Sequence, residues 1–106
     1  MSPDRIASLL SLLEKNPGDH RLRLGLAMEY EKLGRWQDVA RELELYLLHA
    51  DDQGNAWGRL ANALLQLGRD EQARAAYQRG IEAARRHGHP TMASEFEETL
   101  GELENG

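Results

Sequence analysis

The side chains most able to do chemistry include the four histidines, and three of them lie in two short clusters. His87 and His89 flank a glycine and could share a metal ion, but no carboxylate lies near them in the sequence. A protein zinc site needs three or four ligands. His49 precedes Asp51 and Asp52, in a segment typical of a helix end followed by an exposed turn. We therefore expect no metal site at either cluster.

Catalytic patterns are equally weak. Glu97 and Glu98 are adjacent, so on a helix they point in different directions and do not form an acid–base pair. The chain has no cysteine, which excludes disulfides, thiolate metal sites and cysteine nucleophiles. A glycine-rich phosphate loop would have to follow a strand, and no strand is predicted. We expect a protein that is not an enzyme and that has no cofactor.

The charge of the chain is concentrated at one end. Of the 106 residues, residues 1–88 hold 13 basic and 13 acidic side chains, so they sum to zero. The whole net charge of −5 comes from Glu95, Glu97, Glu98, Glu102 and Glu104. A neutral body with an acidic end does not suit nucleic acid. No apolar stretch approaches the ~20 residues of a membrane span, and the start lacks a secretory signal. The expectation is a cytoplasmic protein without a nucleic-acid or membrane partner.

Apolar residues recur at helical intervals in six segments, at about residues 3–15, 20–33, 36–49, 55–67, 70–86 and 91–103. Ser2 can cap the first helix, and Pro3 suits its first position. Gly34 and Gly68 follow the second and fourth helices, where glycine supplies the left-handed backbone that ends a helix. β-branched residues are scarce. The expected fold is all-α, in one domain over residues 1–106.

An internal repeat organises these helices. A shift of 34 residues places Leu26-Ala27 on Leu60-Ala61. The same shift pairs further residues: Tyr30 with Leu64, Gly34 with Gly68, Val39 with Ala73, Leu43 with Tyr77 and Leu47 with Ile81. A fixed period of this kind indicates stacked supersecondary units, each too small to bury its own apolar face.

The repeated residues resemble the tetratricopeptide repeat, whose pattern is Trp-x2-Leu-Gly-x2-Tyr followed by Ala-x3-Phe and Pro. The second unit has Trp57 and Leu60 in this pattern, whereas the first has Arg23 in place of the Trp. The prolines expected near Asp51 and Arg85 are missing. The residues that carry the likeness are Leu26, Ala27, Tyr30, Gly34, Trp57, Leu60, Ala61, Gly68, Ala73 and Tyr77.

The resemblance implies a right-handed superhelical stack of antiparallel helix hairpins. It would contain a half repeat over residues 3–15, repeats over 20–53 and 54–87, and a capping helix over 90–104. In that helix Met92, Phe96, Leu100 and Leu103 would cover the last repeat. The glutamates would be solvated or would form a docking surface for a basic partner. Trp36 and Trp57 are at packing positions, with interface anchoring as the alternative.

The resemblance also implies a function, which is binding another protein or a peptide in a concave groove lined by the first helix of each unit. Carried over by position, the groove residues are Arg21, Leu24, Gly25, Met28, Glu31 and Lys32 in the first unit and Asn55, Gly58, Arg59, Asn62, Leu65 and Gln66 in the second. The mid-helix glycines of this set permit close approach, either by a ligand or by a neighbouring helix.

Other functions stay open at this stage. Some family members clamp the C-terminal carboxylate of chaperones, but Leu24, Met28 and Arg59 stand where that clamp has Lys, Asn and Asn, so we do not expect it. The apolar edge of residues 3–15 could pair with a second copy as a homo-oligomeric assembly unit or weak homodimer. A small secretion or assembly chaperone for a partly folded client is a further alternative. The sequence does not identify the partner.

Overall fold

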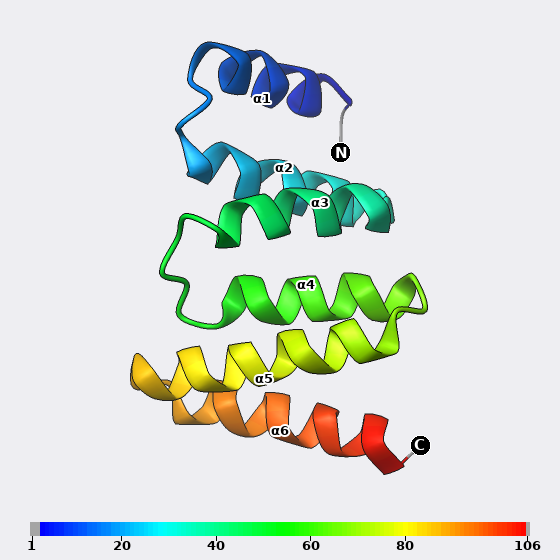
Figure 1. Cartoon of the computed structure of the whole chain (residues 1–106). Helices are drawn as coiled ribbons and strands as arrows, with labels where there is room; N and C mark the ends of the chain where they lie inside the picture. Colours follow the sequence, from blue (N-terminus) through cyan, green and yellow to red (C-terminus); the bar gives the residue numbers. More distant parts are fainter. Residues whose placement is uncertain (1–2, 106) are drawn as a thin grey trace. The chain divides into compact units, whose positions relative to one another are not determined.

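The structure is a computed structural model, and it describes residues 3–105. It has six helices and no strand within those residues: α1 (Pro3–Lys15), α2 (His20–Lys32), α3 (Trp36–Leu47), α4 (Asn55–Gln66), α5 (Asp70–Arg86) and α6 (Pro90–Asn105). The predicted all-α fold and its six helices are confirmed. The predicted cap Ser2 lies outside the described residues. The chain divides into two compact units, Met1–Ala50 with α1–α3 and Asp51–Gly106 with α4–α6 (Figure 1).

In the first unit α3 folds back on α2, and α1 packs on α2 (Figure 1). Gly34 has a φ of +68°, so the predicted glycine does reverse the chain in the left-handed conformation. Among the described residues, Leu26, Val39 and Leu43 are the largest fully buried side chains, because the repeat places them on the facing sides of α2 and α3. Their burial accounts for the hairpin.

Two buried glutamates hold the first unit together by ion pairs. Arg23, at the position where the second unit has Trp57, donates to Glu42 Oε1 of α3 at 3.0 Å. Arg5 of α1 lies 3.5 Å from Glu29 of α2. Glu29 and Glu42 are each only 4% exposed, and a carboxylate this deep needs a cation nearby. The first unit therefore uses charge pairs beside its apolar core.

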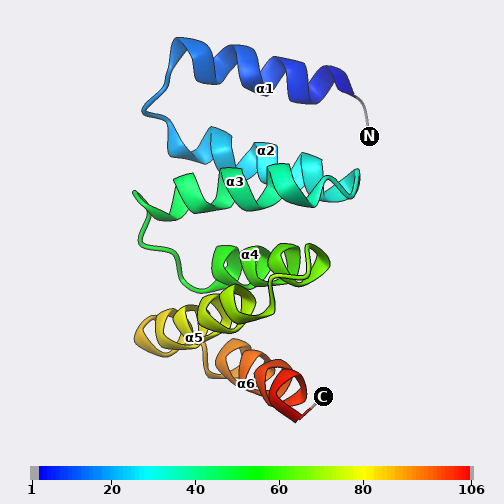
Figure 2. The same ribbon diagram turned by 45° about the vertical axis from the view of Figure 1, so that its right-hand side comes forward.

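In the second unit α5 folds back on α4, and α6 packs on α5, as the two views show (Figures 1 and 2). Leu60, Ala61 and Tyr77 are buried between α4 and α5 as predicted, and Ala73 is fully enclosed. Trp57 is only half-buried; its ring lies under the Arg79 guanidinium, 5.6 Å from centroid to Cζ. Leu60, Ala61, Ala73 and Tyr77 thus form part of the core of this unit, with Trp57 at its margin.

The start of α4 is fixed by Asp52, whose carboxylate accepts hydrogen bonds from the backbone N–H groups of Gly54 at 2.8 Å and Ala56 at 2.9 Å. These are donors that the first turn of a helix leaves unpaired. The sequence identifies this segment only as a break between helices. In the structure Gly54 is the N-cap residue of α4, and the Asp52 carboxylate, two residues earlier, pairs with the backbone N–H groups there.

The last helix covers the end of the second unit. Met92, Phe96 and Leu100 of α6 pack against a buried cluster of Ile81, Ala84 and Ala93. Its five glutamates are all exposed: Glu95, Glu97, Glu98, Glu102 and Glu104. The predicted apolar stripe therefore faces α5, and the acidic side faces solvent. Over residues 3–105, no helix has both the length and the apolar character needed to span a membrane.

Candidate functional site

The face of α4 predicted to bind a partner is open to solvent. Asn55, Arg59, Asn62 and Gln66 recur at intervals of three or four residues, so they lie along one side of the helix. None of them is buried, nor is the neighbouring Leu65. The buried residues of α4 are on its other sides: Ala56, Leu60, Ala61, Ala63 and Leu64. Core packing leaves this one face of α4 available.

The polar groups on the α4 face are arranged in a row. Arg59 Nε donates to Asn55 Oδ1 at 3.0 Å, one helical turn apart, which holds the guanidinium along the helix. Half-buried Asn62 makes no side-chain hydrogen bond to another described residue. Its amide can therefore donate to a carbonyl and accept from an N–H at the same time. This pairing of groups is what an extended peptide backbone requires.

Gly58 lies beside this face, but the space next to it is filled. A Cβ atom at Gly58 would lie 2.6 Å from the Phe96 ring of α6. Gly80 of α5 faces the same ring, at 3.0 Å. The close approach that Gly58 permits is therefore made by a neighbouring helix of the same unit, so we remove Gly58 from the candidate surface.

The predicted residues of α2 also form one face. Arg21, Lys32 and Met28 are exposed, Met28 at 38%, while Leu24 and Glu31 are half-buried. Arg21 pairs with Asp19 at 3.4 Å and Lys32 with Glu29 at 3.2 Å, so both cations are already engaged locally. A Cβ atom at Gly25 would be in ordinary contact, at 3.7 Å, with Leu9 of α1. Part of the α2 face thus serves the packing of α1.

The histidines near the end of α5 bind a loop of their own unit. His87 Nε2 lies 3.2 Å from Asp51 Oδ2, and His89 Nε2 lies 2.5 Å from Gln53 Oε1. The His87 imidazole and the Arg86 guanidinium hold the pKa of Asp51 below its usual value. Residues 3–105 contain no group of three or more His, Asp or Glu placed to hold a metal ion. Sequence proximity gives no sign of these partners, which are more than 30 residues away.

A second histidine arrangement was also not foreseen. The rings of His20 and His49 are stacked, with centroids 4.2 Å apart and planes only 6° from parallel. Imidazole lone pairs lie in the plane of the ring, so stacked rings do not direct their nitrogens at a common ion. This pair joins the start of α2 to the residues that follow α3.

The comparison with protein families concerns the second unit. A model of the tetratricopeptide repeat matches residues 54–87, which contain α4 and α5. Residues 54–87 are therefore similar to a tetratricopeptide repeat. No curated protein and no solved structure matches the chain. Tetratricopeptide repeats generally bind other proteins and are typically not enzymes. The open face of α4 therefore lies on the first helix of the segment that this family model matches.

Proposed function

We propose that this protein is a non-enzymatic adaptor or scaffold that binds a segment of a partner protein through the exposed face of α4 in the second unit, and that the exposed face of α2 offers a binding surface of its own in the first unit. The observation that carries the proposal is the tetratricopeptide repeat at residues 54–87, whose first helix keeps one face clear of the core. Repeats of this family mediate protein–protein binding. In the second unit we assign that role to Asn55, Arg59, Asn62, Leu65 and Gln66 of α4. In the first unit, taken by itself, we assign it to Arg21, Leu24, Met28, Glu31 and Lys32 of α2.

The chemistry of the α4 face suits a peptide. Asn62 offers both a donor and an acceptor to a peptide backbone, and Arg59 offers a planar cation that matches a carboxylate. Leu65 adds apolar surface next to them. Specific polar groups around an apolar contact are the usual composition of a peptide-binding surface.

The test is the double variant Arg59→Glu with Asn62→Ala, used as bait for quantitative affinity capture from the native organism. We expect a partner held by the α4 face to be recovered at least about tenfold less with this variant, because a charged contact is reversed and an amide is lost. The matched control is Gln72→Ala with Arg74→Glu, which likewise removes one side-chain amide and reverses one Arg charge, but on α5. Equal recovery by wild type and the double variant, at unchanged helicity, contradicts the proposal.

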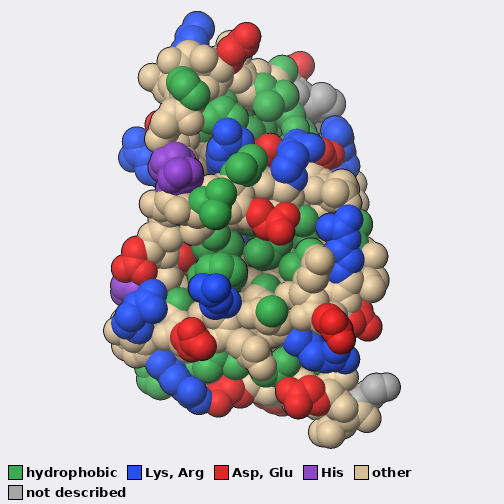
Figure 3. All heavy atoms as spheres, in the orientation of Figure 1, with side chains coloured by type: hydrophobic (Ala, Val, Ile, Leu, Met, Phe, Trp, Pro, Cys, Tyr) green, Lys and Arg blue, Asp and Glu red, His purple; other side chains and the backbone are tan. Residues whose placement is uncertain are grey.

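A second candidate function is self-association through α1, favoured by two exposed leucines. Leu10 and Leu12 are 44% and 46% exposed. In the space-filling view, hydrophobic side chains reach the surface over α1 (Figure 3). Leu9, by contrast, packs toward Gly25 of α2, so it is unsuitable as a probe.

Light scattering distinguishes this candidate from the first. A dimer that becomes monomeric when Leu10 is changed to Glu supports assembly through α1. A wild-type chain that is monomeric at all accessible concentrations eliminates it. The control variant Leu48→Glu changes a leucine that is 73% exposed in the same unit.

A further inference from the structure

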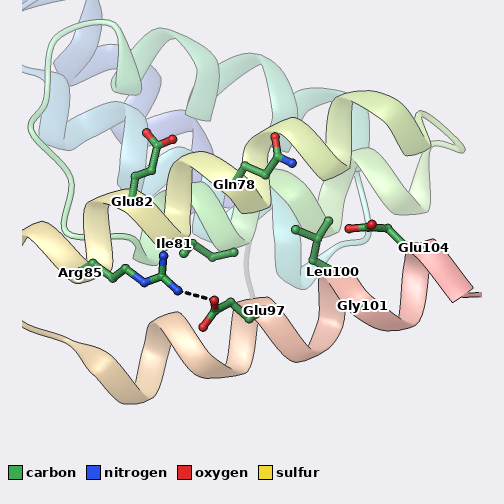
Figure 4. A pocket seen from close by; sticks show the side chains of 8 residues that line it. All are labelled: Gln78, Ile81, Glu82, Arg85, Glu97, Leu100, Gly101 and Glu104. Carbon is green, nitrogen blue, oxygen red and sulfur yellow. Dashed lines mark hydrogen bonds and ion pairs between the residues drawn. The ribbon is translucent and has the colours of Figure 1, made fainter.

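A cleft of about 420 Å³ lies between α5 and α6 in the second unit, and none of the residues proposed for partner binding contributes to it. Each helix lines the cleft with one row of side chains, which recur mostly at intervals of three or four residues. Ile81 and Leu100 lie between the helices and form its apolar floor (Figure 4). At one end an ion pair between Arg85 and Glu97 bridges the two walls (Figure 4). The α6 wall runs over the eight residues from Glu97 to Glu104, which makes the cleft about 10 Å long. This length matches about three residues of extended peptide.

Gly101 is the most informative residue of this cleft. It lies inside α6, where glycine is less favourable to a helix than alanine, yet a Cβ atom at this position would meet nothing within 4 Å. Gly58 and Gly80 are also inside helices, but Phe96 fills the space beside them. Packing therefore explains those two glycines and does not explain Gly101. Its missing side chain widens the cleft on the α6 wall.

The charges around the cleft define the ligand. Glu82 and Glu104 line it, and neither has an ion pair with another described residue. The only cation in the lining, Arg85, is already paired with Glu97. Residues 89–106 add no Lys or Arg and carry the entire net charge of the chain.

We propose that the α5–α6 cleft is a second docking site, and that it binds a short basic peptide segment of another protein with one apolar side chain flanked by Lys or Arg. The apolar side chain lies on Ile81 and Leu100, next to the gap at Gly101. The flanking cations reach the carboxylates of Glu82 and Glu104. This site goes beyond the proposed function of the α4 face, because it uses different helix faces and a different ligand chemistry.

The test uses a defined probe, the fluorescein-labelled peptide Gly-Gly-Lys-Leu-Arg-Gly-Gly, with binding followed by fluorescence anisotropy. Two control peptides replace the Leu by Ser, or the Lys and Arg by Gln. We expect the full-length protein to bind the probe at least about fivefold more tightly than either control, since each lost contact is of that order. Raising the salt from ~0.02 M to ~0.2 M should weaken binding, because the contacts of the cations are exposed.

Two protein variants connect the binding to the cleft. Gly101→Met fills the gap without opposing helix formation, so the melting temperature of this variant should equal or exceed that of the wild-type protein. Its binding of the probe should fall at least about fivefold. Glu82→Gln with Glu104→Gln should give a similar loss. The matched controls are Thr91→Met and Glu95→Gln with Glu98→Gln, which place the same changes at exposed positions of α6 outside the cleft. Both controls should bind the probe as wild type does.

Three results overturn the proposal. The first is no measurable binding of the probe to the wild-type protein. The second is unchanged binding by Gly101→Met. The third is an equal loss in Glu95→Gln with Glu98→Gln, which means diffuse attraction to an acidic helix. Because these variants leave α4 intact, the α4 proposal and the cleft proposal fail independently. Binding of the probe by Arg59→Glu with Asn62→Ala at wild-type strength confirms that separation.

Discussion

Gly54 combines a backbone conformation that favours glycine with close packing against neighbouring atoms. Its φ is +126°, a backbone conformation that residues with a side chain rarely adopt. A Cβ atom there would lie 2.8 Å from the Met92 sulfur, 3.2 Å from the Gly80 carbonyl oxygen and 3.4 Å from Ala84 Cβ. The loop before α4 is thus enclosed by α5 and α6. We predict that Gly54→Ala strongly destabilises the second unit.

The magnitude follows from two separate costs. Forcing alanine into this backbone conformation costs about 1–3 kcal/mol. The steric cost is added to this, and it comes mainly from the Gly80 carbonyl, because the end of the Met92 side chain can move but the α5 backbone cannot. Overpacking of this kind adds about 1–3 kcal/mol. The total is a loss of about 2–6 kcal/mol, a large share of the ~5–15 kcal/mol of a typical domain.

The matched control is Gly68→Ala. Gly68 also has a positive φ, +75°, but nothing lies within 4 Å of a Cβ atom there. This variant therefore has only a conformational cost, of about 1–2 kcal/mol. Urea unfolding followed by circular dichroism gives both values. If Gly54→Ala loses no more stability than Gly68→Ala, the argument that α5 and α6 enclose the loop is wrong.

Three further predictions concern the core, the buried charges and pH. Leu43→Ala should lower the free energy of unfolding by about 2–5 kcal/mol, because Leu43 is 0% exposed. The control Leu48→Ala, at a 73% exposed position, should change it by less than about 0.5 kcal/mol. Equal losses in the two variants would contradict the packing of Leu43. Arg23→Ala should lower the free energy of unfolding by about 1–3 kcal/mol, because it removes a partner of buried Glu42. A double-mutant cycle should show a smaller loss when Glu42→Gln is already present. Because the pKa of Asp51 is lowered in the folded chain, ionised Asp51 stabilises the fold above its ordinary carboxyl pKa, and this stabilisation is lost as the pH falls. Asp51→Asn should therefore be less stable than wild type at neutral pH, with a difference that disappears in acid; a difference independent of pH would refute that reasoning.

Much of the fold is readable from the sequence because it is local. Helix positions depend on apolar spacing over a few turns, and Gly34 and Gly68 end their helices through their own backbone freedom. The 34-residue period adds the pairing of helices, since equivalent residues must have equivalent surroundings. Leu26 and Leu60 illustrate this, as both are buried where the shift aligns them.

The candidate site is only partly readable in this way. The sequence places Asn62 and Arg59 on one side of a helix, and that side is open in the structure. It gives no sign that Asp52 caps α4 or that His87 contacts Asp51, because these contacts depend on how loops return to the helices. The buried Glu29 and Glu42 were also not predicted, since charged residues on a helix normally indicate its solvent side.

The glycines separate what the sequence determined from what the tertiary structure decided. By itself the sequence fixes the six helices, their turns and the repeat, because hydrophobic periodicity and glycine backbone freedom act within a few residues. Positions 58 and 101 are both glycines inside helices. Phe96 fills the space beside Gly58, whereas Gly101 borders a cleft. The difference depends on which side chains arrive from another helix, and only the packing of α4, α5 and α6 brings them there.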